Sequence, residues 1–179
     1  MTIEQLIDNV IAIEGNYSNH PADRGGPTRW GITEAVARSN GYAGEMRHFP
    51  HHQAVAIYKR NYWQHPGFDK INEHAPRLAE ELFDTGINMG SPVAIGFLQR
   101  ALNALNRNGQ DFSDIKVDRK IGPATVGALK QILTKRGKSG ETVLLKAVEA
   151  LQGERYIKLA EQRPANEAFL YGWLANRIS

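Results

Sequence analysis

The chain has 179 residues, 41% of them hydrophobic and 23% charged, a composition that is typical of a globular protein and excludes a disordered or fibrous class. It contains no cysteine, which excludes disulfide frameworks, thiol nucleophiles and thiolate metal sites. The net charge of +3 is uneven, because residues 1–90 carry −3 (8 Lys/Arg against 11 Asp/Glu) and residues 91–179 carry +6 (14 against 8), so the second half is expected to face an anionic partner.

Helices are predicted along most of the chain. Thr2 and Gln5 match a capping box, and the apolar residues that follow have the spacing of a buried helical face, which predicts a helix from Thr2 to about Ile13 with Glu14 in its last turn. The same reasoning predicts five further helices, at 33–39, 50–63, 76–88, 123–135 and 140–162. Another helix is predicted to begin with Ser91 as its cap and to end before Asn108-Gly109. The last, within 165–179, is predicted to be amphipathic and to bury its apolar face. The predicted fold class is therefore mostly α.

Residues 13–33, IEGNYSNHPADRGGPTRWGIT, interrupt the helical pattern. Glycines and prolines exclude a long regular element there, so we expect a loop or a short β-hairpin that ends at Thr33, the cap of the next helix. Glu14 and Asp23 lie in this segment with eight residues between them. Two carboxylates in unlike environments suit glycoside hydrolysis, in which one acid donates a proton and the other stays ionised; the structural alternative is that both acids cap turns.

The segment resembles the signature of glycoside hydrolase family 108, a family of phage and bacterial lysozymes. That signature reads approximately E-G-G-Y, then P-x-D-x-G-G-x-T and G-I-T. The matching residues are Glu14, Gly15, Tyr17, Pro21, Asp23, Gly25, Gly26, Thr28, Gly31, Ile32 and Thr33. Further matches extend the resemblance over the chain: IYKRNYW (57–63), LFDTGINMG (82–90), LQRALN (98–103), VDRKIGPAT (117–125) and FLYGWLANRI (169–178). Asn16 and Arg119 stand where the family patterns have glycine.

The resemblance implies a lysozyme-like helical fold with a catalytic part, residues 1–90, and a C-terminal part, residues 91–179, that resembles a peptidoglycan-binding domain and packs with the first. It implies hydrolysis of the β-1,4 bond between N-acetylmuramic acid and N-acetylglucosamine, with Glu14 as proton donor. By similarity to other phage lysozymes, Asp23 and Thr28 position the attacking water, although the interval between them is one residue shorter here. No cofactor and no metal are implied.

Substrate contacts are expected from three further residues. The aromatic rings of Tyr17 and Trp30 are placed to line the cleft, because exposed aromatic faces commonly stack on sugar rings. Asn88, four residues after Asp84 on a predicted helix, is expected to reach the floor of the cleft, and an internal hydrogen bond to loop backbone is its structural alternative.

The expected protein is thus a monomeric endolysin that binds peptidoglycan and no nucleic acid, since the basic half lacks a recognised reading helix. Lacking a predicted signal peptide or membrane span, it is expected in the host cytoplasm and would reach the wall through a separate pore. Contact of the last helix with the outer membrane is an alternative role for that helix. The rival functions are a lytic transglycosylase acting on the same bond and a non-catalytic wall-binding protein.

Overall fold

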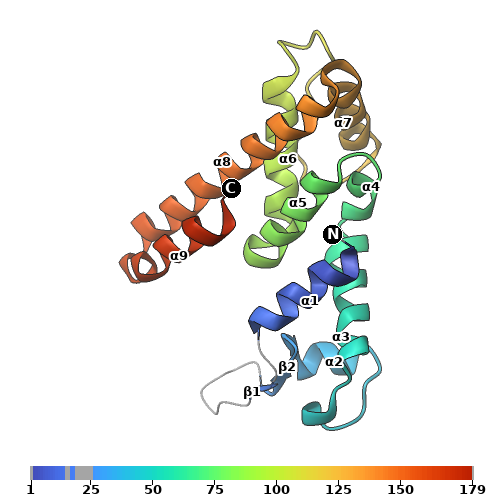
Figure 1. Ribbon diagram of the computed structural model, residues 1–179, viewed down its shortest axis with the longest axis vertical. Helices are drawn as coiled ribbons and strands as arrows, with labels where there is room; N and C mark the ends of the chain where they lie inside the picture. Colours follow the sequence, from blue (N-terminus) through green and yellow to red (C-terminus); the bar gives the residue numbers. More distant parts are fainter. Residues whose placement is uncertain (1, 15–16, 19–25, 179) are drawn as a thin grey trace. The chain divides into compact units, whose positions relative to one another are not determined.

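The computed structural model describes residues 2–14, 17–18 and 26–178, apart from the side chains of Ile13 and Glu14. It divides into two compact units, Met1–His65 and Pro66–Ser179. Helices dominate both units and the strands are short (Figure 1). This confirms the predicted fold class, a mostly α protein with a small β element.

The first helix of unit 1 begins where the sequence predicts. Helix α1 (Ile3–Glu14) is preceded by Thr2, whose backbone N–H donates to Gln5 Oε1 at 2.9 Å while Gln5 N–H donates to Thr2 Oγ1 at 3.2 Å. This reciprocal pair is the predicted capping box. The buried side chains of Ile7 and Ile11 lie on the predicted apolar face. The helix ends at Glu14, which is in its last turn as expected.

A three-stranded antiparallel sheet follows α1, in the order β1 (Tyr17–Ser18), β2 (Thr28–Arg29) and β3 (Ile32–Thr33). Strands β2 and β3 are joined by Trp30 and Gly31, whose φ angles of 55° and 72° suit a two-residue hairpin turn in which both central residues are left-handed. Thr33 then caps α2 (Glu34–Ser39), since its side chain accepts from the Val36 N–H. Both the hairpin and the cap confirm predictions from the sequence.

The rest of unit 1 supports α1 and the sheet. The 3₁₀ turn η1 (Met46–His48) packs on β2, and α3 (His51–Tyr58) packs on α1. The helix predicted at 50–63 continues beyond α3, but its final part, η2 (Lys59–Gln64), is wound as a π-helix. Trp63 in this part is buried.

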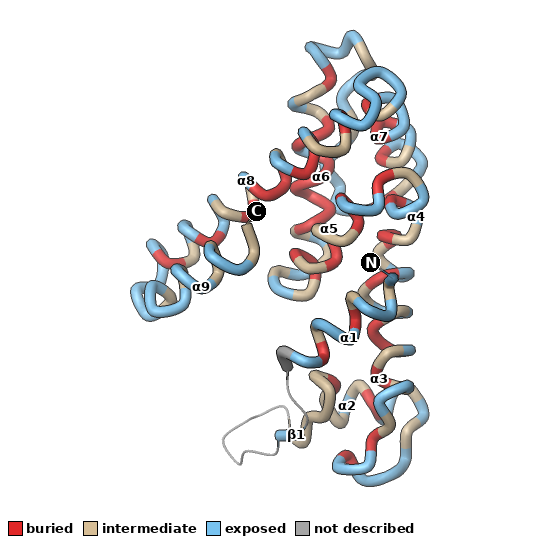
Figure 2. Tube along the Cα trace, viewed as in Figure 1, coloured by how far each residue is buried: buried red, intermediate tan, exposed pale blue. Residues whose placement is uncertain are grey.

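Unit 2 is a helical bundle that consists of α4 (Phe68–Asn72), α5 (Pro76–Met89), α6 (Ser91–Leu105), α7 (Pro123–Arg136), α8 (Lys138–Gln162), η3 (Pro164–Asn166) and α9 (Glu167–Arg177). Helices α5 and α6 pack on each other and on α8, and they carry much of the buried surface (Figure 2). The prediction that Ser91 caps α6 is wrong. Gly90, at φ 92°, is the cap, because the turn between α5 and α6 requires a left-handed residue, and Ser91 is the first helical residue.

The last helix, α9, departs from its prediction. None of its residues is buried, and Phe169 and Tyr171 are 59% and 86% exposed. Trp173 attaches α9 to α8, since its ring stacks on the buried Tyr156 of α8 with 5.2 Å between centroids. The apolar face of α9 is therefore only partly covered. Among the described helices, none is both long enough and apolar enough to cross a bilayer.

Candidate functional site

The predicted catalytic residues belong to the junction between α1 and the small sheet. Glu14 is the last residue of α1, and β1 begins three positions later at Tyr17. Strand β1 pairs with β2 so that Ser18 lies opposite Thr28. The pairing thus brings Thr28 beside a strand that follows Glu14 closely in the chain. Asp23 and Asn16, and the side chain of Glu14, lie outside the described residues.

The side-chain hydroxyl of Thr28 is only weakly hydrogen-bonded within the protein. Its hydroxyl donates to the Gly26 carbonyl at 3.4 Å, which is long for a hydroxyl hydrogen bond, and the residue is only half-buried. A hydroxyl held this weakly can turn to bind a water molecule. Its role in positioning water remains a prediction.

Tyr17 borders an open groove of about 460 Å³ in unit 1. The groove is lined by the ring of Tyr17, by Pro27 and Met46, and by four charged side chains, Glu34, Arg38, Glu45 and Arg47. The Arg47 guanidinium lies 5.6 Å from the centre of the Tyr17 ring, and Tyr17 is 39% exposed. An exposed ring on the wall of a polar groove has the surroundings in which a sugar ring can stack.

One wall of this groove is held by Arg38, which sequence reasoning did not single out. Its guanidinium donates to Glu34 Oε1 at 2.7 Å, to the Tyr42 carbonyl at 2.9 Å and to the Gly44 carbonyl at 2.6 Å. It therefore ties helix α2 to the segment that leads into η1. The i, i+4 spacing of Glu34 and Arg38 was the available signal, but the two carbonyl contacts depend on how the chain turns after α2.

The Trp30 side chain is held in place by contacts with three neighbouring residues. Its indole N–H donates to the Phe49 carbonyl at 3.0 Å, its ring meets His51 edge to face at 5.0 Å, and the Arg29 guanidinium lies 5.0 Å from the ring centre. These contacts anchor the β2–β3 turn to the start of α3 and hold a non-glycine residue at positive φ. Whether Trp30 also contacts substrate remains a prediction.

Asn88 lies in unit 2, on α5, with its amide engaged on its own helix. Asn88 Nδ2 donates to the Asp84 carbonyl at 2.7 Å and to Asp84 Oδ2 at 3.3 Å. The Asp84 carboxylate also accepts from Arg177 of α9 at 2.7 and 3.0 Å. Asn88 thus forms an internal hydrogen bond, but to its own helix rather than to loop backbone, and its contact with substrate remains a prediction.

Sequence reasoning missed a buried polar cluster between α5 and α8. Gln152 Nε2 donates to Thr85 Oγ1 at 3.0 Å, and the Thr85 hydroxyl donates to Glu81 Oε1 at 3.0 Å. Burial raises the pKa of Glu81 to about 7, and the negative charges of Asp84 and Glu149 act in the same direction, against the Thr85 hydrogen bond and Arg177. The available signal was that Glu81 and Thr85, four positions apart, fall among the apolar residues of α5.

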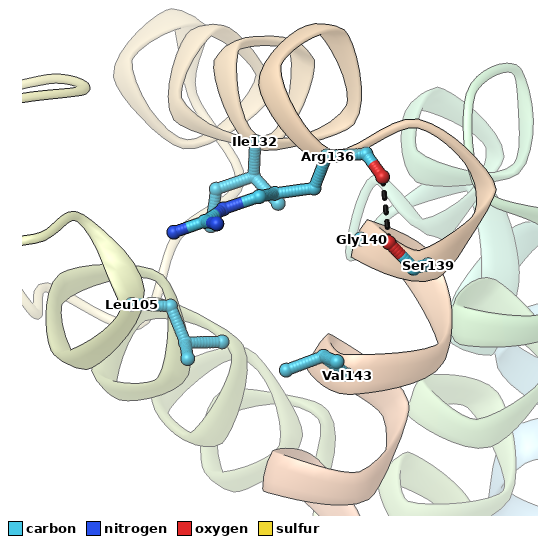
Figure 3. A pocket seen from close by; sticks show the side chains of 6 residues that line it. All are labelled: Leu105, Ile132, Arg136, Ser139, Gly140 and Val143. Carbon is cyan, nitrogen blue, oxygen red and sulfur yellow. Dashed lines mark hydrogen bonds between the residues drawn. The ribbon is translucent and has the colours of Figure 1, made fainter.

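A second cavity, of about 240 Å³, lies between α6, α7 and α8. Figure 3 shows Leu105, Ile132 and Val143 around it, with the Arg136 side chain extending alongside Ile132. Its lining contains one cation and, among the described residues, no carboxylate. It therefore lacks the pair of acids that glycoside hydrolysis requires.

Comparison with known proteins covers both halves of the chain. The sequence model of the family described as Glycosyl hydrolase 108 matches residues 7–90, and the model described as Predicted Peptidoglycan domain matches residues 93–178. A solved structure, "Structure of Brucella abortus SagA", is similar in fold with a TM-score of 0.55 and 22% sequence identity, covering 94% of this chain and 95% of that chain. Comparison with curated proteins gives no match.

Proposed function

We propose that this chain, which belongs to the glycosyl hydrolase 108 family through residues 7–90 and continues as a peptidoglycan domain, is an endolysin. As a member of that family it is a glycoside hydrolase of the lysozyme type. The bond that we propose it cuts is the β-1,4 bond between N-acetylmuramic acid and N-acetylglucosamine. The observation that carries the proposal is the position of Glu14. It ends α1 directly before the small sheet and lies within the residues matched by the hydrolase family.

Glu14 is the proposed general acid. It donates a proton to the glycosidic oxygen as the bond to the anomeric carbon breaks, so the leaving sugar departs as a neutral alcohol. Asp23 is the proposed second carboxylate, which accepts a proton from the attacking water, and the Thr28 hydroxyl helps to orient that water. We favour direct attack by water rather than a covalent intermediate.

The substrate is proposed to lie along the polar groove beside Tyr17. An aromatic ring on the groove wall offers an apolar face to a sugar, and the charged side chains around it offer hydrogen-bonding groups to hydroxyl and acetamido groups. Trp30 is a further substrate contact in this proposal. The substrate contact expected of Asn88, which lies in unit 2, stays a separate prediction.

The test is digestion of purified peptidoglycan by the parent protein and by Glu14→Gln, with mass spectrometry of the products. We expect new muramic acid reducing ends from the parent and at least a hundredfold slower release by the variant, since general acid catalysis contributes about 10²–10⁴-fold. Glu4→Gln is the matched control, because Glu4 is on the same helix but is exposed and paired with Lys59 at 2.7 Å. It should retain full activity.

The same digest separates the rival functions. A lytic transglycosylase would release 1,6-anhydro sugar and would tolerate Asp23→Asn, whereas hydrolysis requires Asp23. Identical behaviour of the parent and Glu14→Gln in every assay would instead indicate a wall-binding protein without activity.

The endolysin role adds a proposal about location. The enzyme would accumulate in the host cytoplasm, act as a monomer and reach the wall through a separate pore. Expression in bacterial cells should then cause lysis only when a pore-forming protein is produced with it. Lysis without that protein would contradict this part of the proposal.

A further inference from the structure

The surface of unit 2 carries a cationic groove of about 250 Å³ between α6, α8 and the segment before α7. Four cations line it, Arg100, Arg119, Arg155 and Lys158, against a single carboxylate, Glu154, a net charge of +3. The Val93, Phe97 and Val117 side chains add apolar surface. The groove thus combines concentrated positive charge with small apolar patches.

Most of this positive charge is not neutralised within the protein. Glu154 is paired with Lys158 at 2.6 Å, one turn along α8. Among the described residues, no carboxylate forms an ion pair with Arg100, Arg119 or Arg155. Three guanidinium groups beside one groove repel one another, and an anion that binds between them relieves this repulsion.

Arg119 is held in the groove at a conformational cost. Its φ of 63° is left-handed, a conformation that suits glycine better than arginine. The buried Gln99 fixes this turn, because its Oε1 accepts from the Arg119 N–H at 2.8 Å while its Nε2 donates to Asp118 Oδ1 at 2.8 Å. A methyl group added at Gly96 would lie 3.6 Å from Arg119 Cγ, so the side chain runs along α6. The strained residue is therefore directed along the groove wall.

From this arrangement we propose that the groove binds the free carboxylates of peptidoglycan stem peptides. This inference rests on the proposed function, because the polymer that the enzyme cuts supplies the ligand. The glycan strands are neutral once the muramic acid carboxyl is amide-linked to the peptide, so the stem carries the anionic groups. Guanidinium groups bind carboxylates in a two-pronged manner, and the apolar patches suit the methyl groups of alanine.

The groove is assembled from three separate parts of the chain. Helix α6 contributes Arg100, helix α8 contributes Arg155 and Lys158, and the loop before α7 contributes Arg119. Residues 116–138 contain seven Lys/Arg against one Asp. Of these cations Arg119 lines the groove, whereas Lys130 and Lys135 lie outside its lining, on α7. These two lysines provide a charge-matched comparison.

The test is co-sedimentation of Glu14→Gln protein with insoluble sacculi stripped of phosphate polymers by hydrofluoric acid. Arg119→Gly added to this protein should weaken binding by about three- to fivefold, which is the effect of losing one partly exposed charge pair. Arg100→Gln combined with Arg155→Gln removes two such pairs and should weaken binding by about tenfold or more. Lys130→Gln with Lys135→Gln should leave binding unchanged. Arg119→Gly should also leave the melting temperature unchanged or higher, which excludes misfolding as the cause of weaker binding.

Chemical modification identifies the ligand. Amidation of the carboxyl groups of the stripped sacculi should reduce binding of the Glu14→Gln protein to the level of the groove variants. Those variants should bind unmodified and amidated sacculi equally. Equal binding of the Glu14→Gln protein to both kinds of sacculi would overturn the proposal. Binding that disappears when the phosphate polymers are removed would overturn it as well. The hydrolysis assay is separate, so loss of the proposed activity and loss of this binding site are recognised independently.

Discussion

Replacing Glu81 by glutamine should stabilise unit 2 at neutral and alkaline pH and change little in acid. The carboxyl lies between α5 and α8, where burial raises its pKa from 4.5 to about 7. Its surroundings include Asp84 and Glu149, which disfavour a third negative charge, and Arg177, which favours it. The folded protein therefore prefers the protonated acid.

The sign and size of the effect follow from linkage. Between the unfolded value of 4.5 and the folded value of about 7, the folded state binds more protons than the unfolded state, so the free energy of unfolding falls as the pH rises through this window. A tenfold change in a protonation equilibrium corresponds to about 1.4 kcal/mol, which makes the full difference about 3 kcal/mol. Because Glu81 is not fully enclosed, solvent screening reduces the expected loss to about 2–3 kcal/mol. Below about pH 4.5 the loss is absent.

Glutamine keeps an oxygen that can accept from Thr85 but cannot ionise. Urea unfolding followed by circular dichroism, from about pH 4 to pH 8.5, should give curves for the parent and Glu81→Gln that meet in acid and separate by about 2–3 kcal/mol above pH 7. Glu161→Gln, the same change at an exposed position of α8, should leave the slope of the curve unaltered. Parallel curves for the parent and Glu81→Gln would refute the reasoning. Hydrolysis of peptidoglycan by Glu81→Gln should persist, since Glu14 is the proposed acid.

Two further variants test interactions that hold the fold. Thr2→Ala removes one half of the capping box on α1 and should lower the free energy of unfolding by about 1 kcal/mol, measured by urea unfolding, whereas Thr2→Ser should retain most of it; equal stability of Thr2→Ala and the parent would contradict the cap. Gln99→Leu removes the side chain that accepts from the Arg119 N–H and donates to the Asp118 carboxylate, and it should lower the melting temperature and speed hydrogen exchange in residues 117–122. Unchanged exchange in that loop would show that Gln99 does not hold it.

Several features of the fold were predictable because they depend on residues close together in the chain. The capping box of Thr2 and Gln5 and the cap at Thr33 are contacts over three residues, so local spacing was sufficient to predict them. The hairpin was predictable because glycine at position 31 tolerates the left-handed turn that joins two adjacent strands. The family signature in residues 13–33 likewise named Glu14, which the structure places at the end of α1.

Other features required the tertiary structure. Ser91 has the local pattern of a cap, yet Gly90 takes that place because the packing of α5 against α6 dictates a left-handed turn. The raised pKa of Glu81 depends on its burial and on the charge of Glu149 of a distant helix. The cationic groove joins side chains from α6, α8 and the loop between α6 and α7. The sequence by itself determined the helices, the caps at Thr2 and Thr33 and the family resemblance, because these depend on residues close together in the chain. Burial and charge proximity, which arise only when distant segments pack together, decided which acid has a raised pKa and where the cations meet.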